Sequence, residues 1–149
     1  MSRLEVPLKY RTLRATGDTV LWASLMLRLK TNQGAWKDIP FRLDPGTEMT
    51  TMPAFEARKL DLPIPKHPVS GLVPHGQEVR SGFLRARIVG MDLTEFVFPC
   101  YFVGDPNIPP RAQAWNLLGL TGVINQIRLC FDGSTSALAP WGILLVEKR

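Results

Sequence analysis

The sequence predicts an all-β protein with one or two short helices, and three observations point to this fold class. Thirteen prolines and twelve glycines separate short apolar segments, as in strands joined by turns at intervals of about ten residues. Several segments alternate apolar and polar residues with the period of two expected for a strand with one buried face. The apolar fraction of 45% and the charged fraction of 21% are typical of a globular protein with a packed core.

The first strands are expected between residues 25 and 43. Leucines occupy every second position of residues 25–30, which predicts a strand with one buried face. The Asn-Gln-Gly sequence of residues 32–34 predicts a turn. Residues 39–43 repeat the alternation with isoleucine, phenylalanine and leucine, so a second strand is expected to lead directly to Asp44.

A short helix is expected at residues 53–60. Thr50 or Thr51 can cap its free amides with a hydroxyl, and Pro53 suits the first helical turn. Prolines at positions 63, 65 and 68 are expected to end this helix and to impose an extended chain.

The rest of the chain is expected to form further strands and loops. Residues 71–82 begin and end with glycine and contain Pro-His-Gly-Gln, which predicts a mobile hairpin tip. The same reasoning predicts strands at residues 83–88, 96–102, 127–131 and 142–146, a loop at 104–111, and one or two helical turns at 121–126.

One domain, residues 1–149, is expected, because a mass of 16.7 kDa suits one core and is small for two. The amino terminus carries charges and has no apolar stretch of signal-peptide length, so a cytoplasmic location without membrane contact is expected. Cys100 and Cys130 both lie in apolar, strand-like segments, which predicts reduced core thiols.

The net charge of +5 does not by itself indicate a nucleic-acid partner. The 18 lysines and arginines are scattered along the chain, which favours a solvated basic surface. The four tryptophans are expected in the core or at an interface, since they are not interleaved with basic clusters in the sequence. His67 and His75 have no partners at metal-site or Ser-His-Asp spacing, so neither a metal nor another cofactor is expected.

Two stretches carry a more specific signal. In the first, Phe-Arg-Leu-Asp-Pro-Gly-Thr-Glu-Met-Thr-Thr-Met-Pro at residues 41–53 continues to a Lys-Leu-Asp-Leu at 59–62. In the second, residues 116–132 read Asn-Leu-Leu-Gly-Leu-Thr-Gly-Val-Ile-Asn-Gln-Ile-Arg-Leu-Cys-Phe-Asp. Taken alone, an Asp-Pro-Gly-Thr sequence is most often a plain reverse turn.

In this order and spacing, the two stretches resemble the retropepsin-like aspartic peptidases, whose half-size subunits dimerise around one shared site. The first resembles the family's strand, its Asp-Thr/Ser-Gly turn and the following helix; the second resembles its apolar-apolar-Gly segment. Together they cover about 40 of the 149 residues. The resemblance implies a single retropepsin-like acid-protease lobe, a closed β barrel, that acts as a homodimer on a peptide or protein substrate.

The resemblance also implies the site residues. Asp44 takes the catalytic position and meets Asp44 of a second copy, because a chain this short supplies the aspartate once. Pro45, Gly46 and Thr47 form the active-site loop, with the Thr47 hydroxyl near the outer carboxylate oxygen. The floor under this loop is Leu117, Leu118 and Gly119. The flap over the substrate lies within residues 71–82 and has as its contact residues Val73, Pro74, His75, Gly76 and Gln77.

Two departures from the family leave the activity open. Pro45 stands where the family has a threonine or serine that links the two active-site loops, and proline has neither that hydroxyl nor an amide hydrogen. Leu120 and Thr121 stand where the family often has Arg-Asp. The alternatives are therefore a catalytically silent lobe that binds peptide or a partner protein and, from another class, a basic β domain that binds nucleic acid.

Overall fold

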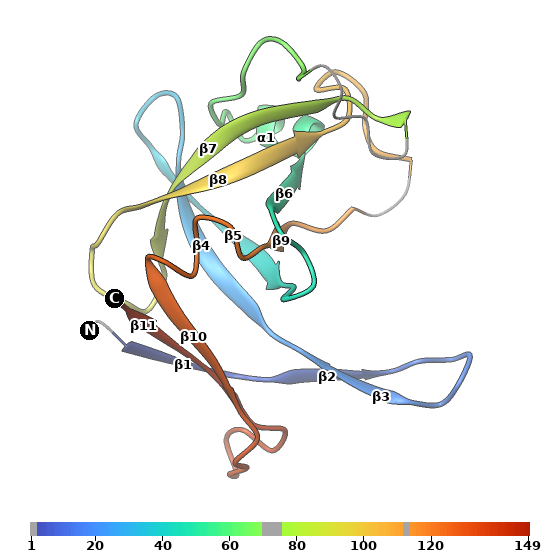
Figure 1. The fold of residues 1–149 in the computed structure, drawn as a ribbon, viewed down its shortest axis with the longest axis vertical. Helices are drawn as coiled ribbons and strands as arrows, with labels where there is room; N and C mark the ends of the chain where they lie inside the picture. The colour runs from blue at the N-terminus through green and yellow to red at the C-terminus, as the bar shows by residue number, and fades with distance from the viewer. Residues whose placement is uncertain (1–2, 70–75, 112–113) are drawn as a thin grey trace.

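Figure 1 shows the computed structural model of the chain, in which residues 3–69, 76–111 and 114–149 are described. Over these residues the secondary structure consists of strands, turns and one helix, α1 (Ala54–Lys59). This confirms the all-β fold class. One or two short helices were expected, and the described residues contain one.

A closed barrel forms the larger part of the fold. Its strands follow one another around the barrel in the order β4 (Ser24–Lys30), β5 (Trp36–Leu43), β9 (Leu117–Leu118), β6 (Thr50–Pro53), β8 (Phe96–Val103) and β7 (Val79–Ile88). The strand residues that the alternation placed inside are buried, and Phe41, Phe98 and Phe102 are fully shielded from solvent. The strands predicted at 25–30, 39–43, 83–88 and 96–102 are therefore four of the six strands of this barrel.

A three-stranded antiparallel sheet lies beside the barrel in the order β1 (Arg3–Pro7), β11 (Ile143–Lys148) and β10 (Ile127–Asp132) (Figure 1). One face packs on the core through the fully buried Ile127, Leu144 and Val146. The first and last strands thus pair with each other within one chain. The strands predicted at 127–131 and 142–146 are confirmed.

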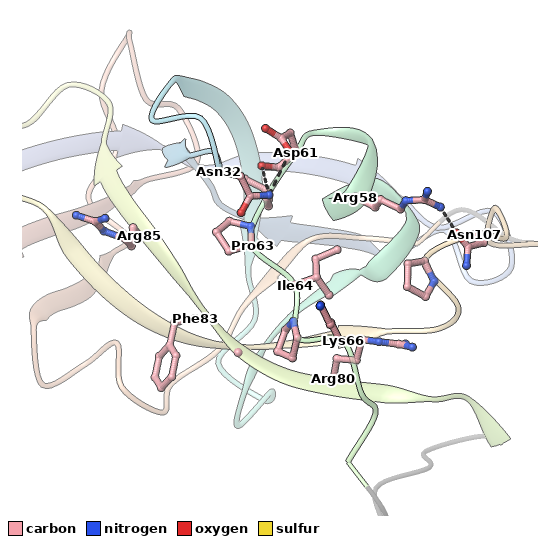
Figure 2. Close-up of a pocket in the computed structure, with 14 residues that line it drawn as sticks. Asn32, Arg58, Asp61, Pro63, Ile64, Lys66, Arg80, Phe83, Arg85 and Asn107 are labelled. Carbon is pink, nitrogen blue, oxygen red and sulfur yellow. Dashed lines mark hydrogen bonds between the residues drawn. The ribbon is translucent and has the colours of Figure 1, made fainter.

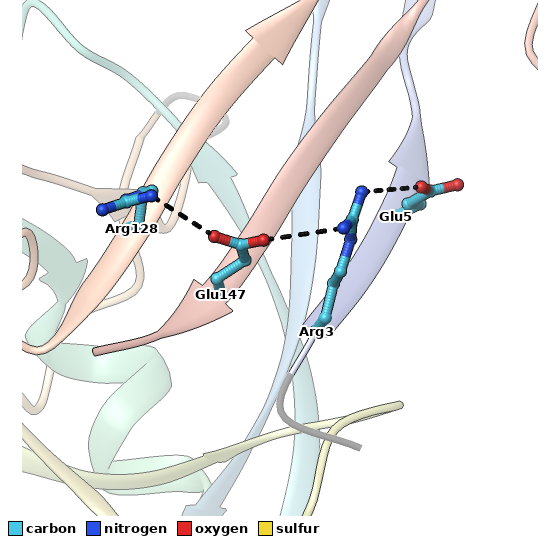
Figure 3. A network of polar contacts seen from close by, with 4 residues as sticks. All are labelled: Arg3, Glu5, Arg128 and Glu147. Carbon is cyan, nitrogen blue, oxygen red and sulfur yellow. Dashed lines mark hydrogen bonds and ion pairs between the residues drawn. The ribbon is translucent and has the colours of Figure 1, made fainter.

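The other face of this sheet carries a charged cluster at one end. Glu147 of β11 lies between Arg3 of β1, at 3.8 Å, and Arg128 of β10, at 3.7 Å, and Arg3 also contacts Glu5 at 3.4 Å (Figure 3). Both arginines are more than half exposed, so each pair contributes only about 0–1 kcal/mol. Burial of the apolar face holds the sheet in place.

A hairpin of β2 (Lys9–Thr12) and β3 (Thr19–Trp22) extends away from the barrel (Figure 1). The sequence analysis did not predict it. All four residues of β2 are exposed, so this strand lacks the apolar alternation by which the other strands were found.

The start of α1 differs from the prediction. Thr50 and Thr51 belong to β6 and pair with β8; neither caps the helix, whose N-cap is Pro53 without a side-chain hydrogen bond. The Thr50 hydroxyl instead accepts a hydrogen bond from the amide of Gly119, at 3.1 Å. A long-range contact has therefore taken the side chain that local reasoning assigned to a helix cap.

Residues 121–126 form consecutive turns. The Ile124 amide donates to the Leu120 carbonyl at 3.2 Å and the Ile127 amide to the Val123 carbonyl at 3.0 Å, which is the bonding of the predicted helical turns. Two further predictions need correction. Strand β7 begins at Val79, so the last part of the predicted hairpin tip at 71–82 is regular strand, and the Val69 amide donates to the Val79 carbonyl at 2.8 Å. Cys100 is buried as expected, but Cys130 is exposed on the outer face of β10. Both cysteines are free thiols.

Among the described residues, every helix is too short and too polar to cross a lipid bilayer.

Candidate functional site

Asp44 lies in a tight turn at the end of strand β5. Its amide donates to the Leu118 carbonyl at 3.1 Å, and its own carbonyl accepts from the Thr47 amide at 3.0 Å. The second bond closes a β-turn in which Pro45 and Gly46 occupy the central positions, where their conformational preferences suit the chain reversal. The turn is therefore anchored to a second strand as well as closed on itself.

The Asp44 carboxylate is held by two donors of the same turn. The Gly46 amide donates to Oδ1 at 3.0 Å, and the Thr47 hydroxyl donates to Oδ2 at 2.7 Å. Each carboxylate oxygen keeps lone pairs for a further donor. Such bonds also occur in ordinary turns that begin with aspartate, so the surroundings of this turn decide what its carboxylate can do.

The Leu-Leu-Gly segment, which the sequence analysis predicted as the floor, lies beside the turn. Strand β9 lies between β5 and β6, with Leu118 paired to Leu43 and fully buried. Gly119 passes so close to the backbone of β6 that an added Cβ would lie 2.4 Å from the Met49 carbonyl carbon. Only glycine permits this approach.

Backbone hydrogen bonds continue the link beyond the floor. The Leu120 amide donates to the carbonyls of Thr47 and Glu48, at 3.2 and 3.1 Å, and the Thr121 amide donates to the Glu48 carbonyl at 2.7 Å. Both ends of the Asp44 turn are thus tied to the 117–121 segment through main-chain groups. The side chains at positions 120 and 121 take no part in these bonds.

A cavity of about 510 Å³ opens at Asp44. Asp44 and Pro45 line it together with aromatic, apolar and basic side chains from four other parts of the chain. The lining residues beyond the turn include Leu21 and Trp22 of the β2–β3 hairpin, Arg42 of β5, Trp115 and Leu117 at β9, and Phe131 of β10. The carboxylate is thus accessible to a ligand.

The described part of the predicted flap lines a neighbouring hollow. Gly76 and Gln77 border a cavity of about 770 Å³ that also contacts Trp115. Because Trp115 lines both cavities, the hollow at Gly76 and Gln77 is adjacent to the hollow at Asp44. The other predicted flap contacts, Val73, Pro74 and His75, lie outside the described residues.

Comparison with known proteins gives limited information. The chain matches neither a protein-family model nor a curated protein. Its fold resembles a crystal structure of a retropepsin-like aspartic protease from Rickettsia conorii, with 12% sequence identity and a TM-score of 0.48 over 85% of this chain and 94% of that one. Likeness at that level leaves the function to be argued from the residues of this chain.

A third cavity, of about 750 Å³, is lined by none of the predicted site residues (Figure 2). Arg58, Lys66 and Arg80 lie toward one end of it, and Phe83 and Arg85 lie toward the other (Figure 2). Two of the arginines are paired: Arg80 with Glu78 at 3.0 Å, and Arg85 with Glu95 at 2.6 Å. No sequence motif predicted this cavity, because its lining residues are distant in the chain and belong to ordinary loops and strands.

The tryptophans have closer basic neighbours than the sequence suggested. The Arg42 guanidinium carbon lies 5.1 Å from the Trp22 ring centre and 5.4 Å from that of Trp115. Arg87 lies 4.1 Å from the ring centre of Trp36. None of the four tryptophans is buried, so their expected placement in the core is wrong, and an interface stays a prediction. These cross-strand neighbours could not be read from the order of the chain.

Within the described ranges, no three histidine, cysteine, aspartate or glutamate side chains converge as a metal site would require.

Proposed function

We propose that this chain is one subunit of a homodimeric aspartic endopeptidase that hydrolyses peptide bonds with a water activated between two copies of Asp44. One observation supports the proposal best. A carboxylate with a fixed orientation, held by Gly46 and Thr47, faces an open cavity at the point where β5 meets β9.

The chemistry explains why two copies are needed. One carboxylate takes a proton from water as the water oxygen attacks the peptide carbonyl carbon, and one carboxylic acid donates a hydrogen bond to the carbonyl oxygen. When the tetrahedral intermediate collapses, the carbon–nitrogen bond breaks and the departing nitrogen takes a proton from the pair. A single Asp44 cannot be charged and protonated at the same time. A symmetric dimer supplies the second group.

The surface around Asp44 supports a dimer. Leu21, Trp115 and Phe131 line the Asp44 cavity, yet each is 47–48% exposed. Large apolar side chains gathered on a surface mark interaction sites. A second copy related by a twofold axis would cover part of this surface and place the two aspartate turns opposite each other.

The proposed substrate is an extended peptide segment. The cavity at Asp44 and the hollow that contains Gly76 and Gln77 are adjacent at Trp115. An extended peptide lying along both could bond to the enzyme through its main chain, which is how sheet edges bind strands. The flap side would then exclude water from the reacting carbonyl.

The test is cleavage of an unfolded protein by the wild type and by Asp44→Asn. The wild type is expected to cut with a bell-shaped pH dependence, because one carboxylate must be charged and one protonated. Asp44→Asn should abolish cleavage while leaving the melting temperature and the dimer unchanged. Asp38→Asn, which removes an equal charge from the barrel wall, is the matched control and should cleave normally. Cleavage that survives in Asp44→Asn would refute the proposal.

The alternative is a catalytically silent lobe that binds peptide or a partner protein. Pro45 favours it, since this exposed residue lacks the hydroxyl and the amide hydrogen that could bridge two active-site turns. A silent lobe would form the dimer without cutting. The distance between the two Asp44 carboxylates in a dimer structure distinguishes the readings, because shared-proton chemistry requires contact.

A further inference from the structure

Arg42 is in strand β5 and Asp44 is the first residue after its end, so the alternation of the strand directs both side chains away from the core. The residues between and before them, Phe41 and Leu43, point into the core with exposures of 0% and 6%. Side chains two positions apart on a strand share a face and lie about 7 Å apart along it. Both Arg42 and Asp44 accordingly line the cavity of about 510 Å³.

Two indole rings hold the Arg42 guanidinium. Its central carbon is 5.1 Å from the Trp22 ring centre and 5.4 Å from the Trp115 ring centre, which is the range of favourable cation–π contacts. Trp22 comes from the β2–β3 hairpin and Trp115 from the segment before β9. Three separate parts of the chain thus fix this cation beside the Asp44 turn.

The guanidinium is held in position but not neutralised within the described part of the chain. No carboxylate there lies within 4.0 Å of Arg42, and no side-chain hydrogen bond involves it. A second cation, Lys9, lies 5.0 Å from the centre of the Trp22 ring. The cavity therefore contains a positioned guanidinium whose N–H groups are available to a ligand.

We propose that Arg42 selects peptides with an aspartate or glutamate side chain next to the bond that is cut. This inference rests on the proposed peptidase function and names its substrate class. A guanidinium binds a carboxylate through two parallel hydrogen bonds, and its N–H edge stays available when aromatic rings cover its faces. In a twofold dimer, each subunit would supply one such subsite.

The cavity chemistry favours an acidic partner over an apolar one. An apolar side chain placed against Arg42 would strip water from the guanidinium without replacing its hydrogen bonds, which is unfavourable. An acidic side chain replaces those bonds and neutralises the charge. The charged residues that line the cavity are Arg42 and Asp44, and only Asp44 would repel it.

The experiment compares matched peptides. A pool of unstructured peptides is digested, the best-cut site is identified by mass spectrometry, and peptides are made with Glu, Gln or Leu beside the cut bond. For the wild type, kcat/KM should be about tenfold to hundredfold higher for the Glu peptide than for the Gln peptide. In Arg42→Met this Glu/Gln ratio should fall to about one, and Arg42→Glu should favour Lys instead.

A matched control and a pH readout sharpen the test. Arg87→Met removes another arginine that stacks on a tryptophan, Trp36, and should leave the Glu/Gln ratio unchanged. The wild-type ratio should also fall toward one as the pH drops below about 4.3, where a glutamate side chain becomes neutral. If the Glu/Gln ratio is the same in Arg42→Met as in the wild type and does not change with pH, the inference is wrong.

Failure of the inference can be told apart from failure of the proposed function. If cleavage depends on Asp44 but the wild type shows no Glu/Gln preference, the inference is wrong and the peptidase stands. If nothing is cut, fluorescence anisotropy decides, with two labelled peptides of one unstructured sequence that differ only in a central Glu or Gln. Tighter binding of the Glu peptide that Arg42→Met removes supports the inference, and equal binding of both refutes it. If Arg42→Met reduces the cleavage of all peptides equally and its dimer dissociates in sedimentation, Arg42 belongs to the interface and the inference is refuted.

Discussion

The cavity at Asp44 and the cavity at Arg80 are both lined by arginines, but their charges are arranged differently. At Asp44, the Arg42 guanidinium contacts two indole rings, and the carboxylate is oriented by two donors of its own turn. At Arg80, the guanidinium donates to Glu78 at 3.0 Å and to the Gly104 carbonyl at 3.4 Å.

The difference teaches that volume and charge do not identify a reactive site by themselves. The Arg80 cavity is the larger, at about 750 Å³ against 510 Å³. Two of its arginines are satisfied by neighbouring glutamates, as in a structural ion pair. The smaller cavity contains an accessible carboxylate and a cation without a carboxylate partner in the described chain, so its groups remain available for a ligand. Four changes test this contrast.

The largest expected effect is that of Gly119→Ala below the Asp44 turn. The added Cβ would lie 2.4 Å from the Met49 carbonyl carbon and 2.7 Å from the Thr50 amide nitrogen, and backbone atoms cannot move aside without distorting β6. We expect a loss of about 3 kcal/mol in the free energy of unfolding, measured by urea titration. Gly133→Ala, where nothing lies within 4 Å, is the control; equal stability of both variants would contradict the close packing of this floor.

Thr47→Val should mainly affect cleavage. It removes the hydroxyl that donates to Asp44 Oδ2 at 2.7 Å but preserves the shape of the side chain. We expect kcat/KM to fall about tenfold, equivalent to about 1.4 kcal/mol, with a small change in melting temperature. Thr47→Ser restores a hydroxyl and should recover most of the activity. If valine and serine behave alike, the hydroxyl does not orient the carboxylate.

Arg80→Met should affect stability alone. The Arg80 side chain is 10% exposed and bonds to Glu78 and Gly104, so its removal should cost about 1 kcal/mol of unfolding free energy. Differential scanning calorimetry measures this loss, and the peptide assay should show unchanged cleavage. A large fall in kcat/KM would show that the two cavities act together and would end the contrast between them.

The smallest effect is expected for an exposed ion pair on the barrel wall, which serves as a baseline for both cavities. The Arg28 guanidinium, bonded at 2.7 Å, lowers the pKa of Asp38 below its ordinary value of 3.8. Because the pKa of Asp38 is lower in the folded state than in the unfolded state, the pair stabilises the fold fully at pH values above the unfolded pKa. This contribution is lost as the pH falls through the lowered, folded-state pKa. Asp38→Asn should therefore lower the melting temperature slightly at pH 7 and less at about pH 3; a difference that grows in acid would contradict this sign.

The sequence by itself determined the elements that rest on local periodicity. Alternating leucines and phenylalanines predicted the barrel strands, because a strand with one buried face needs an apolar side chain at every second position. The Asp-Pro-Gly-Thr turn and the Leu-Leu-Gly segment were also visible as short motifs with their own conformational preferences. In the structure the two motifs lie side by side, with the Leu118 carbonyl accepting from the Asp44 amide.

Only the tertiary structure decided the features that depend on distant residues. The Thr50 hydroxyl binds the Gly119 amide and caps no helix, and Cys130 is exposed because it faces outward from a side sheet. Trp22, Arg42 and Trp115 come together from three parts of the chain. Periodicity records which face of an element is buried, whereas the partner on that face is set by long-range packing, and no local pattern encodes it.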